Sequence, residues 1–582
     1  MMVRNCWRFA ALLVVMGIAG CSHSIAPGND TFPQAWLEPG TRVVLPAPGL
    51  SPAIDKQQLL TGTFNGKSQS LLVMLHADEQ KITLAGLSSV GIRLFKLTYD
   101  ENGLHAEQSI IVPQLPPVSQ VLADVMLSLW PLETWRARLP NGWTIVDKGN
   151  QRELRNASGK LVTEIAYLQR NGLREPISIH NMLLNTKSPF NTWVNNMIYI
   201  SAVGMINALG NSLDEIAANL ARGSAPGMRP RAGWLQGNPE AVLGGVEGEL
   251  PVIPASFSAH RSRNNQLLLA AQEQIQPQVD EAIARFGRDR IAVVMGTSTS
   301  GLNEGDEHVQ LTLNGEVSPR WRYPQQELGD PSRFLSRWLQ VDGPAFTLST
   351  ACSSSARAII SGRRLIEAGL ADVAIVGGAD TLSRMPINGF HSLKSLSSEL
   401  CQPFAQNRCG ITIGEGAALM VLTREPQPLV LLGVGESSDA WHISAPHPQG
   451  EGAIEQALAE ADIEAKQVGY INLHGTATLL NDQIESRVVY SLFGEQVPCS
   501  STKHLTGHTL GAAGITEAAI SALILLRNLP LPAQDFSASP ADSALPACGV
   551  MHTSQPLARP IILSNSFAFG GNNASILLGK DV

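Results

Sequence analysis

Four short, continuous apolar runs constrain the fold of this chain more than any other feature. They lie at 291–301, 372–380, 468–476 and 560–571, and segments of helical character separate them. An apolar run of four to six residues without alternation is typical of a strand that is buried on both faces. From residue 197 onward, the sequence therefore predicts a layered α/β architecture.

Residues 22–196 follow a different pattern, in which short strands are separated by turns. Apolar and polar residues alternate on either side of Asn102-Gly103, which is a hairpin-type turn signal. A helix is predicted over 118–129, where apolar residues follow the i, i+3, i+4 spacing, and Pro131 would end it. An antiparallel sheet with a helix against it would form a small α+β domain.

The N-terminal segment has the features of an export signal. Arg4 and Arg8 precede an apolar run over 9–19, which is too short to span a bilayer as a helix. The run ends in the letters IAGC, which resemble the lipobox of bacterial lipoproteins, in which the cysteine is lipidated. We predict a lipoprotein signal peptide at 1–21 and membrane contact through a lipidated Cys21. The alternative is an ordinary signal peptide with an incidental cysteine.

The composition argues against several classes of function. A formal net charge of −8 gives no support for a nucleic-acid partner. The seven cysteines follow no paired spacing and form no CxxC motif. Neither a disulfide scaffold nor a zinc site is therefore expected, and we predict no metal.

Cys352 lies between a β-prone run and a run of small, helix-prone residues, in the segment TLSTACSSSARAI. A free cysteine is more often a buried core residue than a nucleophile. Here, however, a strand would end at 346–348 and a helix would run from Ser353 to about Gly369. The dipole and the free N–H groups at the helix start would favour the thiolate of Cys352.

Two histidines lie in similar settings. His474 ends an apolar strand in INLHGTATLLND, and His508 lies in a Gly/Ala-rich turn that leads into a helix. Active sites of layered α/β proteins gather at the carboxyl ends of strands. A lone histidine there is usually structural, but one cysteine and two histidines at such turns favour an active site. A glycine hairpin at 565–575 would let the backbone approach a ligand closely.

Four segments, in order, resemble the signature sequences of β-ketoacyl-acyl-carrier-protein synthases of the I/II type. They read GPAFTLSTACSSSA, HGTATLLND, STKHLTGHTLGAAG and SNSFAFGGNNAS. The resemblance covers 197–582 and implies a thiolase fold, with two similar βαβαβαββ halves in five αβαβα layers. We place the halves at 197–437 and 438–582, after a lipoprotein-like α+β domain at 22–196. A homodimer, or a heterodimer with a related ketosynthase, is also implied.

The resemblance further implies a decarboxylative Claisen condensation. Cys352 would take an acyl group from acyl-carrier protein, and malonyl-carrier protein would then lose CO2 and attack the acyl-enzyme. His474 and His508 would stabilise the enolate, and the backbone N–H groups of Cys352 and Phe569 would form the oxyanion hole. No bound cofactor is implied, because the phosphopantetheine arm of the carrier protein brings the substrate.

Several supporting residues carry over from the same family motifs. Thr476 and Thr478 match hydroxyls that hold the phosphopantetheine arm. Lys503 matches the family lysine, and Glu485 is its predicted ionic partner. His504 matches nothing in the family pattern and is predicted to lie on the surface.

An aromatic pair also matches the family pattern. Phe567 and Phe569 correspond to the phenylalanines beside the catalytic cysteine, and Phe569 corresponds to the gate. The alternative reading is two core phenylalanines.

One motif departs from the family pattern. In PFAQNRCGITIGEG, Ala405 and Cys409 replace two acidic residues, whereas Arg408 and Glu415 remain. This departure predicts a weaker ion pair around Arg408. The segment 377–397 and the lipoprotein-like start look similar to parts of aryl-polyene pigment clusters.

Two other functions remain as alternatives. The chain could be a non-catalytic partner, like a chain-length factor, although such partners lack the nucleophile that this chain keeps. Residues 22–196 resemble open-barrel lipoproteins and could bind or transport lipid. A lipobox directs a chain across the inner membrane, whereas malonyl-carrier protein is cytosolic. The predicted locations of the N-terminal part and of the ketosynthase part therefore conflict. We expect a membrane-anchored N-terminal part, a cytoplasmic ketosynthase part, and a working enzyme formed by 197–582.

Overall fold

The chain forms two compact units, which are described separately. They are Met1–Asn195 (unit 1) and Asn196–Val582 (unit 2). The computed structural model describes residues 33–38, 40–51, 53–64, 67–87, 93–108, 118–170, 173–181, 186–188, 197–237, 239–318, 321–442, 447 and 452–580. The predicted signal peptide at 1–21 and the predicted lipidation site Cys21 lie outside these residues.

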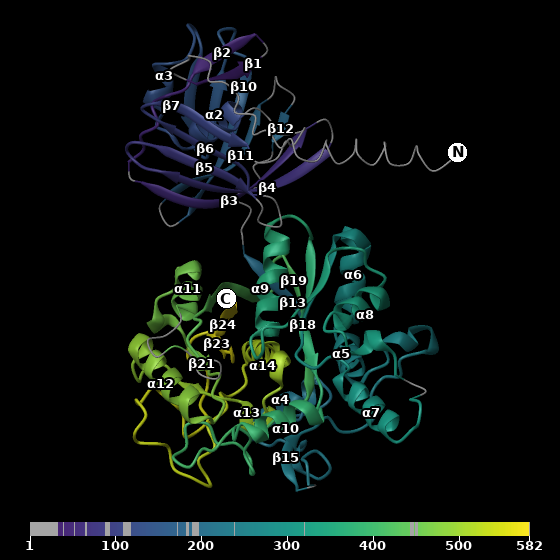
Figure 1. Cartoon of the computed structure of the whole chain (residues 1–582). Coiled ribbons are helices and arrows are strands. Elements are labelled where there is room, and N and C mark those ends of the chain that lie inside the picture. Colours follow the sequence, from purple (N-terminus) through teal and green to yellow (C-terminus); the bar gives the residue numbers. More distant parts are fainter. Residues whose placement is uncertain are drawn as a thin grey trace, which may run out of the picture. The chain divides into compact units, whose positions relative to one another are not determined.

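Unit 1 contains two five-stranded antiparallel sheets, each a simple meander (Figure 1). The first consists of β3 (Ile54–Phe64), β4 (Lys67–Ala77), β5 (Ile82–Leu87), β6 (Arg93–Asp100) and β7 (Gly103–Gln108). The second consists of β8 (Thr144–Lys148), β9 (Gln151–Arg155), β10 (Leu161–Arg170), β11 (Leu173–Asn181) and β12 (Thr186–Ser188). A separate two-stranded sheet joins β1 (Gln34–Glu38) to β2 (Thr41–Val44).

The predicted helix and hairpin of unit 1 are confirmed. Helix α2 spans Val118–Leu129, and Pro131 separates it from the short α3 (Leu132–Arg136). The apolar face of α2 packs into one core with residues from both meanders. The two-residue turn between β6 and β7 is Glu101-Asn102, and Gly103, the first residue of β7, takes a φ of 104° that favours glycine.

Unit 2 contains a ten-stranded sheet in which one five-stranded pattern occurs twice. The first copy runs β17 (Ala345–Leu348), β16 (Ile291–Gly296), β18 (Val373–Asp380), β19 (Gly416–Thr423) and β13 (Ile198–Asn207). The second runs β22 (Cys499–Ser500), β21 (Tyr470–Asn472), β23 (Ile561–Phe567), β24 (Asn572–Lys580) and β20 (Leu429–Ser438). In both copies the first three strands pair in parallel and the last two pair antiparallel.

The two copies meet where β13 pairs with β20, through Ile198–Ile200 and Leu429–Leu431. This duplication confirms the predicted thiolase fold. The predicted boundary between the halves at 437/438 is wrong, however, because β20 is the first strand of the second half and begins at Leu429. Residue 438 is the last residue of β20, so the predicted boundary falls at the end of this strand instead of before it.

Helices complete five layers, as Figure 1 shows. The central layer consists of α9 (Ser354–Glu367) and α14 (Ala513–Arg527), which pack against each other and against both halves of the sheet. One outer layer contains α5 (Arg263–Glu273), α6 (Gln276–Phe286) and α8 (Asp330–Leu339). The other contains α11 (Ala453–Ala461) and α12 (Leu479–Phe493).

Each of the four apolar runs at 291–301, 372–380, 468–476 and 560–571 contains a buried strand: β16, β18, β21 and β23. Leu510–Arg527 is long and apolar enough to cross a membrane, but 89% of it is buried inside the protein, as in a core helix. The remaining elements of unit 2 are α4 (Leu213–Arg222), β14 (Met228–Arg231), β15 (Ala241–Gly244), α7 (Leu302–Leu313), α10 (Arg384–Ser392) and α13 (Lys503–Thr506).

Candidate active site

Cys352 lies in the short connection between β17 and α9. The preceding Ala351 has a φ of 53°, a left-handed conformation that a residue with a Cβ rarely adopts, so the chain turns sharply before the helix. The thiol is buried, and burial raises the pKa of Cys352 to about 11. The backbone N–H groups of Phe569 and of Cys352 itself act in the opposite direction, because both favour negative charge on sulfur.

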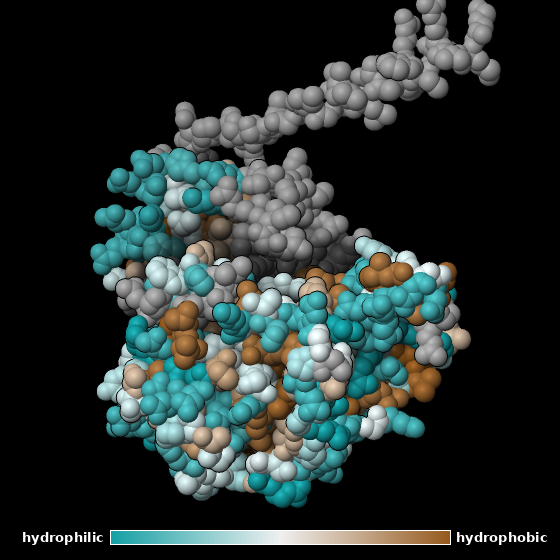
Figure 2. All heavy atoms as spheres, turned by 60° about the horizontal axis from the view of Figure 1, so that its bottom comes forward, coloured by the Kyte–Doolittle hydropathy of each residue, from teal (hydrophilic) through white to brown (hydrophobic). Residues whose placement is uncertain are grey.

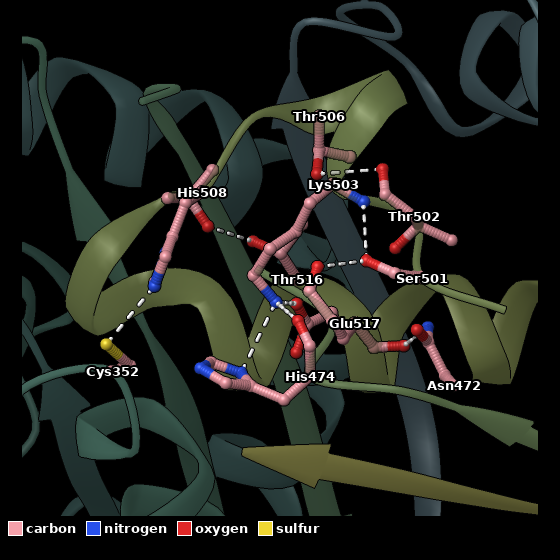
Figure 3. Close-up of polar contacts among 12 residues, drawn as sticks. Cys352, Asn472, His474, Ser501, Thr502, Lys503, Thr506, His508, Thr516 and Glu517 are labelled. Carbon is pink, nitrogen blue, oxygen red and sulfur yellow. Dashed lines mark hydrogen bonds and ion pairs between the residues drawn. The ribbon is translucent and has the colours of Figure 1, made fainter. Parts of the chain in front are cut away.

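His508 occupies the equivalent position in the second half, ahead of the central helix α14. Its Nε2 lies 3.1 Å from the Sγ of Cys352 (Figure 3). The backbone N–H of Leu510 donates to Nδ1 at 3.0 Å. Since Nδ1 accepts that hydrogen bond, a neutral His508 carries its proton on Nε2, which faces the sulfur.

His474 follows β21, and its ring lies perpendicular to that of His508 at 5.5 Å between centroids. The ammonium group of Lys503 lies 3.3 Å from Nδ1 of His474. A lysine ammonium can only donate, so Nδ1 accepts and Nε2 carries the proton. The two histidines therefore present two N–H groups near one sulfur.

Lys503 is almost fully buried, and its ionic partner is not the predicted one. Its Nζ pairs with Glu517 on α14 and also donates to the backbone carbonyl of His474 (Figure 3). Glu485 instead accepts the backbone N–H groups of His474 and Gly475, each at 2.7 Å. The prediction that Glu485 pairs with Lys503 is therefore wrong: Glu485 fixes the turn that carries His474.

The electrostatics of the site suit a ligand oxygen that gains negative charge. Burial, reinforced by the nearby Lys503 charge, holds the pKa values of His474 and His508 well below the ordinary value, so both rings stay neutral donors at pH 7. Two neutral N–H groups beside a buried cation can stabilise an enolate or oxyanion without accepting a proton.

The same cluster has the spacing of a metal site, since the ligand atoms of Cys352, His474 and His508 lie within 4.8 Å of one another. The proton positions oppose that use, because the ring nitrogens facing the centre carry hydrogen rather than a free lone pair. The positive charge of Lys503 is also unfavourable for a second cation. The donor set therefore fits an anionic or carbonyl ligand better than a metal.

A narrow cavity leads to the sulfur. Besides the cysteine and the two histidines, its lining consists of Phe390, Ile411, Thr476, Asn481, Phe567, Ala568 and Phe569. Phe569 is partly exposed and lies 5.7 Å from Phe390 between ring centroids. Thr478 does not line this cavity, but its hydroxyl lies 2.9 Å from that of Thr476.

Four of the lining residues were not predicted: Phe390, Ile411, Asn481 and Ala568. Asn481 lies within the quoted motif HGTATLLND, so that motif was the available signal. Phe390 and Ile411 come from segments far from the cysteine in sequence, and no local pattern distinguishes them from core residues.

The motif with Ala405 and Cys409 keeps a buried arginine that is well paired. Arg408 lies 2.6 Å from a carboxylate oxygen of Asp542 and 3.7 Å from Asp482. The predicted weakening of the ion pair around Arg408 is therefore wrong, because acids from other segments replace the missing ones.

His504 is buried rather than exposed, which corrects the surface prediction. Its Nδ1 lies 3.1 Å from the carbonyl oxygen of Ser501, and burial lowers the pKa of His504 to about 4. The residue belongs to a segment, 499–525, in which every side chain is buried.

Comparisons with known proteins agree with this geometry. Residues 195–427 match the family model "Beta-ketoacyl synthase, N-terminal domain", and 429–536 match "Beta-ketoacyl synthase, C-terminal domain". Residues 55–185 of unit 1 match DUF3261, a "Protein of unknown function".

Two named proteins are similar in sequence to this chain. A 3-oxoacyl-[acyl-carrier-protein] synthase 2 of Rhizobium meliloti is 37% identical over 314 residues, which are 50% of this chain and 73% of that protein. A 3-oxoacyl-[acyl-carrier-protein] synthase 2 of Staphylococcus aureus is 33% identical over 324 residues, 50% of this chain and 75% of that protein.

Solved structures resemble the same part of the chain. A ketosynthase (ApeO) in complex with its chain length factor (ApeC), from Xenorhabdus doucetiae, gives a TM-score of 0.65 at 66% identity, covering 66% of this chain and 98% of the matched chain. A beta-ketoacyl synthase from Burkholderia phymatum gives 0.59 at 26% identity, covering 66% of this chain and 100% of the other. With both family models matched across the duplicated fold, this chain belongs to the beta-ketoacyl synthase family.

Proposed function

We propose that unit 2 catalyses the decarboxylative condensation of an acyl group on Cys352 with malonyl-acyl-carrier protein. The observation that carries the proposal is the contact between the sulfur and His508, at 3.1 Å, with a second N–H donor from His474 beside it. A nucleophile and two fixed, neutral N–H donors are the groups that the two half-reactions need.

In the first half-reaction, the sulfur of Cys352 attacks the acyl thioester of the carrier protein. The new carbon–sulfur bond forms as the bond to the carrier sulfur breaks, and the thiol proton ends on the released carrier. The N–H groups of Cys352 and Phe569 face this sulfur and would bind the oxyanion of the tetrahedral intermediate.

In the second half-reaction, malonyl-carrier protein loses CO2, and the electron pair of the broken carbon–carbon bond forms an enolate. The Nε2–H groups of His474 and His508 would hold the enolate oxygen. The enolate carbon then attacks the acyl carbonyl, the carbon–sulfur bond to Cys352 breaks, and the thiolate takes up a proton. The chain is longer by two carbons.

We propose that the carrier arm enters this cavity. Thr476 is part of the lining, and the hydroxyl of Thr478 lies 2.9 Å from that of Thr476. We assign both residues to the phosphopantetheine site, Thr476 by direct contact and Thr478 through Thr476. No other cofactor is needed for this chemistry.

A second subunit is part of the proposal. Among the described strands, β17 pairs only with β16, so the strand ahead of the nucleophile has an unpaired edge with Phe346 exposed. Figure 2 shows apolar areas among hydrophilic ones on the face that carries α7 and α10, where Val309, Leu313, Met385 and Leu393 are exposed. The 66% identical neighbour was solved with a chain length factor, which favours a heterodimer over a homodimer.

The rival function is a silent partner of another ketosynthase. The relation to ketosynthase and chain-length-factor complexes leaves that role open. Catalysis is favoured by the presence of all three residues, Cys352, His474 and His508, whose reactive atoms lie within 4.8 Å of one another. A silent subunit has no need of a buried nucleophile with two aligned donors.

Mass spectrometry of the purified chain with acyl-carrier protein tests the proposal. Incubation with acyl-carrier protein should add one acyl group to Cys352, and malonyl-carrier protein should then release it as a product two carbons longer. Absence of acyl loading, with and without a chain-length-factor subunit, would exclude the catalytic role. We also propose that the product is a polyene of the aryl-polyene type, and the identity of the loaded acyl group would test this.

We also propose that unit 2 works in the cytoplasm and does not depend on unit 1. The two units are separately compact, and the substrates of the condensation are cytosolic. Expression of 197–582 should give a soluble, active enzyme. If only the full chain condenses substrates, the two units act together and this proposal is wrong.

A lipid-binding assay on 22–196 would test the alternative role of unit 1 as a lipid carrier.

A further inference from the structure

Asn481 lies in the first turn of α12 and lines the cavity that leads to Cys352. Its side chain is 3% exposed. The amide nitrogen donates to Asp482 Oδ1 at 3.2 Å and to Glu485 Oε2 at 3.5 Å. One side of this buried amide is therefore fixed by two acidic side chains.

This arrangement determines which amide atom faces the cavity. Both acidic oxygens also accept backbone N–H groups, so each acts as an acceptor and must face the nitrogen of Asn481. The amide oxygen, Oδ1, then points away from Asp482 and Glu485, toward the space that the side chain lines. The hydrogen bonds that the structure describes for this side chain are the two that its nitrogen donates. The amide oxygen can therefore accept a hydrogen bond from a ligand or from water in the cavity.

The reacting groups cannot supply that donor. An acyl chain, a malonyl thioester and CO2 contain no N–H group, and the Nε2–H groups of the histidines face the sulfur. The phosphopantetheine arm, in contrast, contains two amide N–H groups between its sulfur and its phosphate. It is the part of the substrate that can donate to an amide oxygen in the lining of the cavity.

We propose that Asn481 is a substrate-binding residue whose Oδ1 accepts a hydrogen bond from an amide N–H of the carrier arm. The assignment rests on the condensation proposed above and adds to it a recognition of the arm by its amide. Thr476, on the same cavity, supplies a hydroxyl that can donate or accept, whereas Asn481 supplies an acceptor held in one orientation.

The experiment compares two malonyl thioesters on the full-length, acyl-loaded chain, with its second subunit if activity requires one. Malonyl-pantetheine has both amides, and a malonyl thioester of an unbranched alkanethiol of similar length has none. Asn481→Leu keeps a similar volume but removes the acceptor. We expect kcat/KM for decarboxylation to fall by about tenfold with malonyl-pantetheine and by less than about twofold with the alkyl thioester.

Two further variants keep the test decisive. Asn481→Ala introduces no bulk and should show the same selective loss if Asn481→Leu does not fold. Asn407→Leu makes the same chemical change at an exposed position outside the cavity and should leave both rates and their ratio unchanged. Thermal unfolding of each variant separates loss of fold from loss of binding.

The outcomes distinguish this inference from the proposed function. An equal loss with both thioesters, in a folded variant, would overturn the role of Asn481 and leave the condensation intact. An unchanged kcat/KM with malonyl-pantetheine would do the same and would indicate that only water binds Oδ1. A wild-type chain that condenses neither thioester nor malonyl-carrier protein would overturn the proposed function itself, and this inference with it.

Discussion

The two halves of unit 2 share one strand order but carry different chemistry. In the first half, the connection from β17 to the central helix α9 holds Cys352. In the second half, the equivalent connection holds Lys503 and His508. The connection after the second strand holds Thr297 in one half and His474 in the other. The duplicated frame brings equivalent connections to one place, so one half can supply the nucleophile and the other the N–H donors.

The halves also use the same device to hold these connections. Glu485 accepts the N–H groups of the turn at His474, and Asp380 accepts those of Ser298 and Thr299. Asp380 additionally accepts the N–H of Ala512, at the start of the central helix from the other half. A buried carboxylate therefore anchors each turn, and the one in the first half also ties the two halves together.

The largest expected effect concerns the nucleophile of the first half. Cys352→Ala should abolish acyl loading and reduce condensation by at least about ten-thousandfold, since no other described side chain at the site offers a thiol. The fold should persist, because a small residue fits the start of α9. Intact-mass analysis after incubation with acyl-carrier protein measures loading. Normal condensation by this variant would show that the first half does not supply the nucleophile.

The second prediction concerns a buried ion pair of the second half. Lys503→Met leaves Glu517 buried without its partner and should lower the free energy of unfolding by about 3–5 kcal/mol. Lys503→Met combined with Glu517→Gln should recover most of that loss. Chemical denaturation at pH 8 measures both.

The matched control for this pair lies in the first half. Arg333 and Glu327 are partly exposed, and Arg333→Met should lower the free energy of unfolding by no more than about 1 kcal/mol. Equal losses at Lys503 and Arg333 would show that burial does not distinguish the two pairs.

The third prediction separates the half-reactions. His474→Ala and His508→Ala should each reduce malonyl decarboxylation by about a hundred- to a thousandfold, because each removes an N–H donor to the enolate. Acylation of Cys352 should fall by much less, since its oxyanion is held by backbone groups. Release of labelled CO2 and intact mass report the two steps. Equal losses in folded variants would assign the histidines another role.

The fourth prediction is a pH dependence of stability. Burial raises the pKa of Glu485 to about 7 in the folded state, above its unfolded value, so folding favours the neutral acid. Its contribution is fully present below about pH 4.5 and is lost as the pH rises through 7. Relative to Glu485→Gln, the wild type should lose about 3 kcal/mol of unfolding free energy between those pH values. A pH-independent difference in denaturation midpoints would contradict the raised pKa.

The sequence was most informative where a reactive side chain follows the end of a strand. This is the case for Cys352, His474 and His508, so their convergence could be expected from the sequence alone. Glu485 and Glu517 are both buried acids on helices near Lys503, and spacing alone could not say which one reaches the ammonium. Only their placement in three dimensions decided for Glu517.

Polar residues in buried segments were the other source of error. His504 follows a lysine and looks like a surface residue, yet it lies in a segment whose side chains are all buried. The two acidic residues that the family pattern has near Arg408 are absent from this sequence. Arg408 instead pairs with Asp542, which is 134 residues away. Contacts over such distances leave no local pattern, and the same reason kept Phe390 and Ile411 out of the predicted site.

The separation of 156 positions between Cys352 and His508 in the sequence also has a consequence for protein synthesis. On the ribosome, the cysteine emerges long before its histidine, and β24, which pairs with both β20 and β23, emerges later still. A nascent chain therefore exposes the thiol with none of its reaction partners assembled around it. The sheet beside the thiol is complete only after β24 has been synthesised, so a nascent chain cannot hold Cys352 and His508 in their final arrangement before that point.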